Sequence, residues 1–214
     1  MNKFKARNLF LAFILMVTII CLAVTFTVFF KGLYYFDIHY LHIDEMTNLT
    51  TEQIRHNYDV LIQYQSIFYQ GDLVLPDFVM SASGAHHFAE VKTIFEIVQV
   101  LTVIGLIISI PVTIYKFKTK DFIYFKYVSI VTVVVPVVIG LLASIDFSKA
   151  FVIFHQIMFN NNDWIFDPRY DPVIMILPQA YFMHCFLLII LIVILLSGLY
   201  YASYRYLLKK ELSD

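Results

Sequence analysis

The sequence predicts an all-α integral membrane protein with four transmembrane helices. Composition is the first reason: of 214 residues, 60% are hydrophobic and only 14% are charged, against roughly 25% charged residues in soluble domains. The second reason is a set of four uncharged apolar runs, each close to the roughly 20 residues that a spanning helix needs. They occupy residues 9–30, 97–115, 127–145 and 180–204. We therefore expect one integral membrane domain over residues 1–214, with long loops at about 31–90 and 146–179.

The first apolar run could instead be a cleaved signal peptide. Its 22 residues exceed the roughly 7 to 15 of a signal-peptide core, and no small-x-small cleavage site follows it. Cys21 is preceded by "TII", which lacks the small residue that a lipoprotein signal places before its cysteine. We therefore interpret residues 9–30 as a membrane anchor.

The basic residues predict the orientation in the membrane. Ten of the fifteen Lys and Arg residues fall on one expected side: Lys3, Lys5, Arg7, Lys116, Lys118, Lys120, Lys126, Arg205, Lys209 and Lys210. Because cytoplasmic loops carry the excess of positive charge, both termini are expected to be cytoplasmic (N-in/C-in) and the two long loops extracytoplasmic. A basic inner rim is typical of contact with anionic lipid headgroups, so a nucleic-acid partner is not expected.

The seven histidines all fall in the expected outer loops or at the outer ends of helices. They are His39, His42, His56, His86, His87, His155 and His184. This sidedness suggests that any chemistry takes place at the outer leaflet. The alternative is that interfacial histidines only extend their polar tips to the headgroups, as Tyr and Trp do.

The extended extracytoplasmic region between the first two spanning helices should contain a surface helix. Thr50 and Gln53 have the spacing of a capping box, and apolar residues follow at helical intervals at Ile54, Tyr58 and Leu61. We expect this helix to lie on the outer surface.

The second spanning helix is expected to begin near Ser83, which places "HHFAEVK" in its first turns. Glu90 follows His87 by three residues and His86 by four, so its carboxylate could fix the tautomer of either imidazole and raise its basicity. Lys92 and Glu96 form a second pair at this spacing. Alternatively, such pairs at a helix entrance are only solvated anchors.

A short helix is expected before the fourth span, with Ser148 as its cap and Phe159 as its end. His155 lies four residues from both Phe151 and Phe159, so it faces partly apolar surroundings. Such surroundings disfavour the imidazolium and lower the pKa, which leaves a neutral base available near neutral pH.

The segment that follows this helix is polar and then ordered by proline. "NNND" ends the helix, Trp164 is expected at the headgroup level, and the pairs Asp167-Pro168 and Asp171-Pro172 predict an ordered re-entry segment before the fourth span. Trp164 could equally be an ordinary member of the aromatic belt.

Two stretches together resemble a known family. "HFAEVK" at residues 87–92 and "FHQIMFNNNDWIFDPRYDPVIMILP" at 154–178 are similar, jointly and in order, to the signatures of the bacterial lipoprotein intramolecular transacylases (Lit), a four-helix family of low-GC Gram-positive bacteria. The helix count and the large first outer loop also agree. Glu90 departs from the family pattern, which has Asp there, and the neighbouring His86 competes with His87 for the motif position.

The resemblance implies an acyltransferase of the bacterial plasma membrane with its active site on the extracytoplasmic side. It would move one acyl chain from the sn-2 glycerol oxygen of a diacylated lipoprotein to the α-amine of the N-terminal cysteine, giving lyso-form lipoprotein. The resemblance implies His87 and His155 as catalytic residues, no cofactor or metal, a lipoprotein substrate within membrane lipid, and no obligatory protein partner. The supporting or substrate-binding residues would be His86, Glu90, Lys92, Trp164, Asp167, Tyr170 and Asp171.

Three other interpretations stay open. An acyl-enzyme could form on Ser81 or Ser83 near His86, but the chain has no G-x-S-x-G motif. A metal-dependent enzyme could gather outer His, Asp and Glu residues, but no H-E-x-x-H motif occurs. A non-enzymatic module could bind lipid or peptide at the outer face. Chelator-insensitive turnover of a lipopeptide would exclude the last two.

Overall fold

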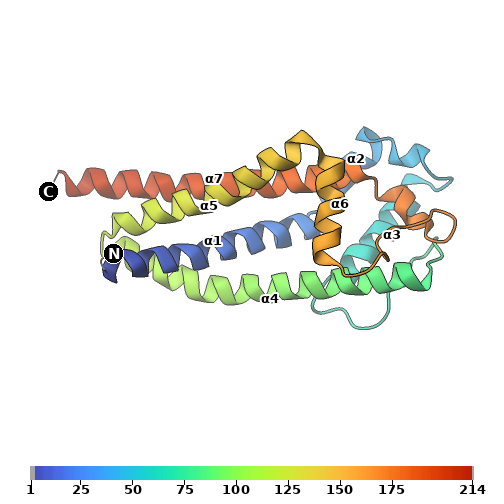
Figure 1. The fold of residues 1–214 in the computed structure, drawn as a ribbon, viewed down its shortest axis with the longest axis horizontal. Coiled ribbons are helices and arrows are strands. Elements are labelled where there is room, and N and C mark those ends of the chain that lie inside the picture. The colour runs from blue at the N-terminus through green and yellow to red at the C-terminus, as the bar shows by residue number, and fades with distance from the viewer. Residues whose placement is uncertain (1–2, 214) are drawn as a thin grey trace. The chain divides into compact units, whose positions relative to one another are not determined.

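The computed structural model describes residues 3–213, except the side chains of residues 3, 4 and 135. All regular structure in this part of the chain is helical (Figure 1). The elements are α1 (Lys3–Phe29), α2 (Lys31–Tyr40), η1 (Ile43–Glu45), α3 (Thr51–Tyr64), α4 (Ala82–Lys118), α5 (Phe122–Ile145), α6 (Phe147–Met158), η2 (Pro172–Ile176) and α7 (Gln179–Glu211).

Four of the described helices, α1, α4, α5 and α7, are long and apolar enough to cross a membrane. Each predicted apolar run falls on one of them, so the all-helical class and the four candidate spans are confirmed. The helices are longer than the runs, because polar residues at their ends continue the backbone hydrogen bonding. The helix expected to start near Ser83 begins at Ala82 and carries "HHFAEVK" in its first turns.

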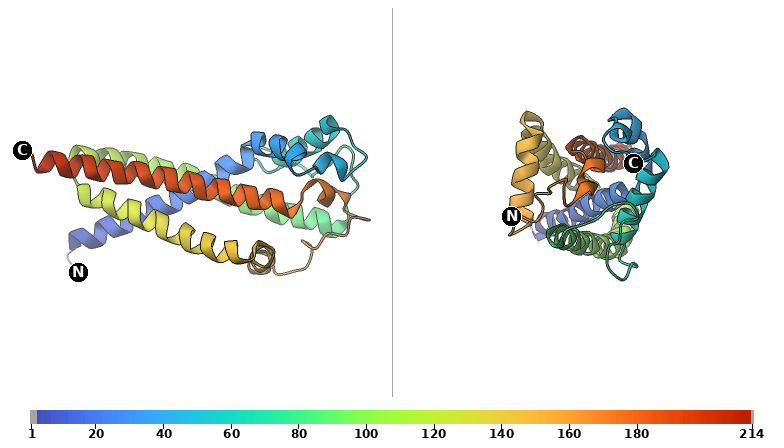
Figure 2. Two further views of the ribbon diagram at one scale, coloured as in Figure 1. Left: turned by 90° about the horizontal axis from the view of Figure 1, so that it is seen from above. Right: turned by 90° about the vertical axis from the view of Figure 1, so that its right-hand side faces the viewer.

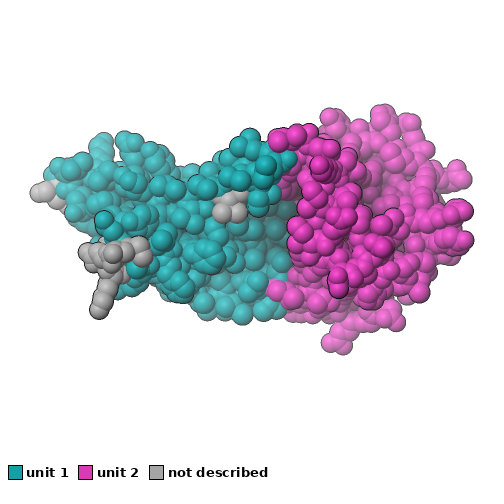
Figure 3. Space-filling view, in the orientation of Figure 1, with its two compact units in different colours: residues 1–25, 98–142, 188–214 teal, residues 26–97, 143–187 magenta. Residues whose placement is uncertain are grey.

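The chain divides into two compact units, coloured separately in Figure 3. Unit 1 contains the described residues up to 25, residues 98–142 and those from 188 onward, and unit 2 contains residues 26–97 and 143–187. Each of the four long helices supplies residues to both units. All the residues predicted for the site belong to unit 2.

Unit 1 is held together by close helix contacts and by a buried ion pair. A Cβ on Gly105 of α4 would lie 2.4 Å from Thr18 Oγ1 of α1, so glycine permits this close approach. Lys116 Nζ, buried, donates to Asp121 Oδ2 and to Asn8 Oδ1, both at 2.6 Å. These bonds compensate the buried ammonium and tie α4 to α1 and to the turn before α5.

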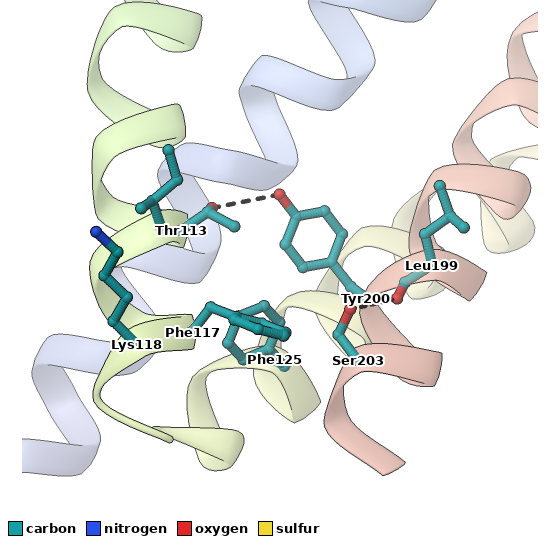
Figure 4. A pocket seen from close by; sticks show the side chains of 8 residues that line it. Thr113, Phe117, Lys118, Phe125, Leu199, Tyr200 and Ser203 are labelled. Carbon is teal, nitrogen blue, oxygen red and sulfur yellow. Dashed lines mark hydrogen bonds between the residues drawn. The ribbon is translucent and has the colours of Figure 1, made fainter. Parts of the chain in front are cut away.

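Unit 1 also contains an apolar cavity of about 290 Å³ (Figure 4). It is lined by Thr113, Ile114, Phe117, Lys118, Phe125, Leu199, Tyr200 and Ser203. The Thr113 and Tyr200 hydroxyls lie 3.3 Å apart and satisfy one another. The lining contains no residue predicted for the site.

Unit 2 has an aromatic core built on α2 and α3. The Tyr34 and Tyr58 rings stack with centroids 3.6 Å apart, Tyr34 Oη donates to the Ile176 carbonyl at 2.7 Å, and the Tyr58 and Tyr181 hydroxyls are 2.6 Å apart. These hydrogen bonds satisfy buried phenols, which an apolar core would otherwise penalise. The predicted capping box of α3 is confirmed: Gln53 N donates to Thr50 Oγ1 and Thr50 N donates to Gln53 Oε1.

Helix α6 starts earlier than expected. The predicted Ser148 cap is wrong: the cap is Asp146, whose Oδ1 accepts from Lys149 N at 2.9 Å. A carboxylate at the N-terminus also complements the helix dipole. Asp146 directly follows the end of α5, so it caps α6 two residues before Ser148. Within unit 2, α6 lies crosswise to the first turns of α4 (Figures 1 and 2). This crossing brings two distant stretches of sequence together.

Candidate active site

The two histidines predicted to be catalytic lie together in unit 2. His87 lies in the first turns of α4 and His155 on α6, and their ring centroids are 6.0 Å apart with 37° between the planes. Aromatic side chains surround the pair: Phe159 and Phe166 lie 4.7 and 5.5 Å from the His87 ring, and Phe151 and Trp164 lie 4.2 and 4.9 Å from the His155 ring. The pair therefore sits among aromatic rings from α6 and from the loop that follows it.

The tautomer of neutral His155 follows from one contact. Its Nδ1 lies 2.7 Å from the Phe151 carbonyl oxygen, one turn back on α6. Because a carbonyl oxygen can only accept, Nδ1 carries the hydrogen and Nε2 keeps a lone pair. Burial lowers the pKa of His155 from its ordinary value of 6.5, against the opposing effect of this hydrogen bond. Burial therefore favours the neutral imidazole, the direction expected from its apolar neighbours.

His87 is buried, with 6% of its surface exposed. Its Nδ1 is also buried and has no hydrogen-bond partner among the residues that the structure describes. Buried polar atoms in proteins are nearly always satisfied, so this imidazole nitrogen, set in a cluster of aromatic rings, is a candidate contact for a bound molecule.

Glu90 makes a different contact from the one expected. Its Oε1 accepts from Asn161 Nδ2 at 2.9 Å. Its Oε2 lies 3.9 Å from His86 Nδ1, too far for a hydrogen bond, and is buried without a hydrogen-bond partner within residues 3–213. The carboxylate is therefore held by an amide of the loop after α6, and the expected carboxylate–imidazole hydrogen bond is not formed. The sequence does not predict this contact of Asn161, because Asn161 and Glu90 are 71 residues apart.

The adjacent histidines of α4 have different partners. His86 is the more exposed, with 57% of its side chain accessible, and its Nδ1 donates to Asp163 Oδ2 at 2.7 Å. His87 faces His155 instead. Successive residues on a helix point about 100° apart, so only one of the two can face α6. The arrangement favours His87 as the partner of His155.

The loop after α6 connects the parts of this site. Asn161 Oδ1 accepts from Asp163 N at 3.0 Å, and the Asn161 carbonyl accepts from Trp164 Nε1 at 3.1 Å. Trp164 in turn lies against the His155 ring. A closed ring of contacts therefore runs from Glu90 through Asn161, Trp164 and His155 to His87, which returns to Glu90 along one turn of α4. Trp164 thus has a specific contact at the site.

Asp171 fixes the start of α4. It is buried, with 3% of its surface exposed, and its two carboxylate oxygens accept from Ser81 N at 2.8 Å and Ser81 Oγ at 2.7 Å. A Cβ on Gly84 would lie 2.2 Å from Asp171 Oδ1, which explains the glycine. Asp171 therefore positions the turn that carries His87. The Ser81 hydroxyl hydrogen goes to this carboxylate, which is not the arrangement of a serine nucleophile with a histidine base.

Lys92 anchors the end of α3. Its Nζ donates to the carbonyls of Tyr64, Ser66 and Tyr69 at 2.7, 3.0 and 3.3 Å. It also pairs with Glu96 at 3.0 Å, the pairing expected from their spacing. A cation is favourable at a helix C-terminus, where carbonyls lack helical partners. These contacts support a structural role for Lys92 in unit 2.

Asp167 and Tyr170 lie on an exposed turn. Asp167 accepts from the Arg169 side chain, and this hydrogen bonding lowers the pKa of its carboxyl to about 2. Tyr170 is 62% exposed. The structure thus brings His86, Glu90 and Trp164 around the histidine pair, and Asp171 supports the start of α4. Among residues 3–213, no hydrogen bond or ring contact joins Asp167 or Tyr170 to either histidine. In the described part of the chain, no three His, Cys, Asp or Glu side chains gather in a metal-binding cluster.

Comparison with known proteins identifies the family. The sequence model of the family described as "Lipoprotein intramolecular transacylase Lit" matches residues 9–182. This stretch includes His87, His155 and the loop that joins α6 to α7. The chain belongs to the Lit family. Members of this family are lipoprotein intramolecular transacylases, so the chain is an acyltransferase.

Solved structures agree with this assignment. The in meso structure of the membrane-integral Lit from Bacillus cereus is 37% identical to this chain, with 100% of both chains covered and a TM-score of 0.94. Two structures of the same Bacillus cereus protein, with one histidine replaced by arginine or by alanine, have TM-scores of 0.87 and cover 99% of this chain and 95% and 96% of theirs. No curated protein matches the chain.

Proposed function

We propose that this Lit protein moves an acyl chain from the sn-2 glycerol oxygen of a diacylated lipoprotein to the α-amine of its N-terminal cysteine. The product is lyso-form lipoprotein with an amide-linked chain and a monoacylglyceryl group. The observation that carries the proposal is the facing pair His87 and His155. His155 keeps a lone pair on Nε2, and His87 has a buried Nδ1 without a hydrogen-bond partner among the described residues.

The reaction needs two proton transfers. The amine nitrogen attacks the ester carbonyl, a C–N bond forms, the C–O bond to sn-2 breaks, and one proton must move from nitrogen to the departing oxygen. His155 Nε2 takes the proton from the nitrogen. In the same sequence His87 passes a proton to the sn-2 oxygen and regains one from His155, so both imidazoles return to their neutral starting state. General acid or base groups of this kind are typically worth about 10² to 10⁴ in rate.

A single substrate molecule supplies both the donor ester and the acceptor amine. Holding these groups in reacting geometry can contribute up to roughly 7 to 11 kcal/mol of barrier lowering. A covalent acyl-enzyme is then unnecessary. The aromatic rings around the histidines provide a dry setting in which the oriented groups act more strongly.

We also propose an N-in/C-in arrangement in one integral membrane domain of the bacterial plasma membrane. The site would then face the extracytoplasmic side, and residues 159–178 would form the re-entry segment before α7. The bias of Lys and Arg supports this orientation. Exposed apolar side chains on α6, including Phe154 at 53% and Ile157 at 76%, suit contact with outer-leaflet lipid. The substrate is the diacylated lipoprotein, and no protein partner is required.

Alanine variants test the histidine roles. His87→Ala and His155→Ala should each reduce turnover by about 10² to 10⁴ without unfolding the protein. Because both residues serve one proton-transfer sequence, the double variant should be scarcely slower than the slower single variant. His86→Ala is the matched control and should retain measurable activity, since its partner is Asp163.

Product formation should be scored by tandem mass spectrometry of a lipopeptide in matched membranes. Near-normal turnover by His155→Ala would refute the mechanism. An inactive His86→Ala beside an active His87→Ala would move the assignment to the neighbouring residue.

A further inference from the structure

Glu90 presents one buried oxygen without a partner. Asn161 Nδ2 occupies Oε1 at 2.9 Å, while Oε2 is buried and accepts no hydrogen bond from any residue that the structure describes. An ionised carboxylate only accepts hydrogen bonds, and a buried oxygen that receives none is unfavourable. Glu90 Oε2 can therefore accept a hydrogen bond from a bound molecule.

The nearby nitrogen donors already have other partners. His86 Nδ1 donates to Asp163 at 2.7 Å and lies 3.9 Å from Glu90 Oε2. Lys92, two residues along α4, donates to three backbone carbonyls and pairs with Glu96. The missing donor is therefore expected from a ligand.

A second unsatisfied atom lies one turn away on α4. His87 Nδ1 is buried and unpartnered, on a side chain that is 6% exposed and three residues before Glu90. The ring of contacts through Asn161, Trp164 and His155 closes around both residues. An anionic acceptor and two imidazoles thus surround one site.

We propose that Glu90 Oε2 binds the α-ammonium group of the substrate's N-terminal residue. This proposal rests on the proposed function, in which that group is the nucleophile. An ammonium has three donors, so it can donate to Glu90 Oε2 while another hydrogen faces His155 Nε2. Asn161 is a positioning residue that turns the carboxylate so that one oxygen stays free.

The carboxylate also suits the chemistry of attack. The ammonium first loses one proton to water, and the neutral amine attacks the ester carbonyl while His155 Nε2 accepts a second proton from the nitrogen. The nitrogen becomes positive again as the C–N bond forms, so a fixed negative charge beside it stabilises the transition state more than the neutral amine. The N–H donated to Glu90 is retained throughout, so the carboxylate needs no proton of its own.

A pair of unreactive ligands tests the amine site. Both are lipopeptides whose alkyl chains are joined to glycerol by ether bonds, which cannot be transferred; one has a free α-amine and the other an N-acetyl group. The wild-type protein in detergent should bind the free amine about tenfold or more tightly, because only that ligand offers a charged donor. Binding is measured by competition with a fluorescent dialkyl lipopeptide.

Substitutions then assign the preference to Glu90. Glu90→Gln should bind both ligands about equally, and Glu90→Asp should recover part of the preference because it restores the charge. Glu96→Gln is the matched control: it removes a carboxylate from the same helix, one paired with Lys92, and should keep the wild-type preference. Thermal melting of each variant shows whether it is folded.

Two outcomes separate this inference from the proposed function. If the wild-type protein transacylates a diacyl lipopeptide but binds the two ether ligands equally, the amine site at Glu90 is refuted and the function stands. If it neither transacylates nor binds either ligand, both are refuted. A preference that survives in Glu90→Gln would also overturn the assignment.

Discussion

At the scale of single residues, the sequence predicted the histidine pair but not what orients it. The choice between His86 and His87 depends on the direction each side chain takes from α4, which spacing does not fix. Asp163 and Asn161 make their contacts across 77 and 71 residues of sequence, so no local pattern reveals them. Polar side chains in a loop become site residues only through the fold that brings them to α4.

The titration of His155 is a direct test at this scale. Because burial lowers its pKa below 6.5, His155 should remain neutral down to a pH below 6.5. The unfolded chain binds a proton first, so the stability contribution of this group is complete above about 6.5 and is lost as the pH falls through the folded pKa. Activity should fall over the same acidic range.

NMR titration of labelled imidazoles measures this pKa, with the His155 signal assigned by its disappearance in His155→Ala. A free histidine peptide in the same buffer provides the reference. A His155 pKa above 6.5 would contradict the described environment.

At the scale of elements, the sequence predicted one helix cap correctly and a second one wrongly. The capping box of α3 was predicted because both of its partners lie within one turn. The cap of α6 was missed because Asp146 and Ser148 are both suitable residues, and the end of α5 decides between them. The anchoring of α4 by Asp171 joins residues 90 apart in sequence and was beyond any local pattern.

A single methyl group tests the anchoring of α4. Gly84→Ala places a Cβ 2.2 Å from Asp171 Oδ1, so either the carboxylate or the helix must move. Overpacking of this kind costs about 1 to 3 kcal/mol, and displacement of the turn that carries His87 should lower turnover by roughly tenfold or more.

Gly198→Ala is the matched control, since nothing lies within 4 Å of its Cβ. It should be neutral, or stabilising by roughly 0.5 to 1 kcal/mol, because alanine is the better helix former. Thermal melting and turnover are measured for both variants. A Gly84→Ala protein as stable and as active as Gly198→Ala would rule out the anchoring role.

At the scale of the whole molecule, composition was sufficient to predict four long helices. Helices satisfy their own backbone hydrogen bonds in lipid, so uninterrupted apolar length is nearly enough to identify them. The aromatic core of unit 2 could not be predicted in this way, because its tyrosines come from α2, α3 and α7. The contacts between the loop after α6 and α4 could not be predicted for the same reason, since they join residues far apart in the sequence.

Orientation in the membrane is tested by cysteine labelling of intact cells. In a background lacking Cys21 and Cys185, Gln70→Cys and Asn160→Cys should react with an impermeant maleimide, because the proposed N-in/C-in arrangement puts both outside. Thr119→Cys, in the turn between α4 and α5, should react only after the membrane is opened. All three side chains are exposed. Labelling of Thr119→Cys alone in intact cells would invert the arrangement.

The central claim is that the acyl chain moves within one lipoprotein molecule, and mass spectrometry tests it most directly. Lipoproteins are isolated from a bacterial host that makes only the diacyl form, before and after expression of this protein. Intramolecular transfer is an isomerisation, so the intact mass should stay the same while tandem spectra show one chain moved from the glyceryl group to the N-terminal nitrogen. The His155→Ala variant should leave the fragments in the diacyl pattern. A gain in mass of one acyl chain, or fragments unchanged by the wild-type protein, would contradict the account.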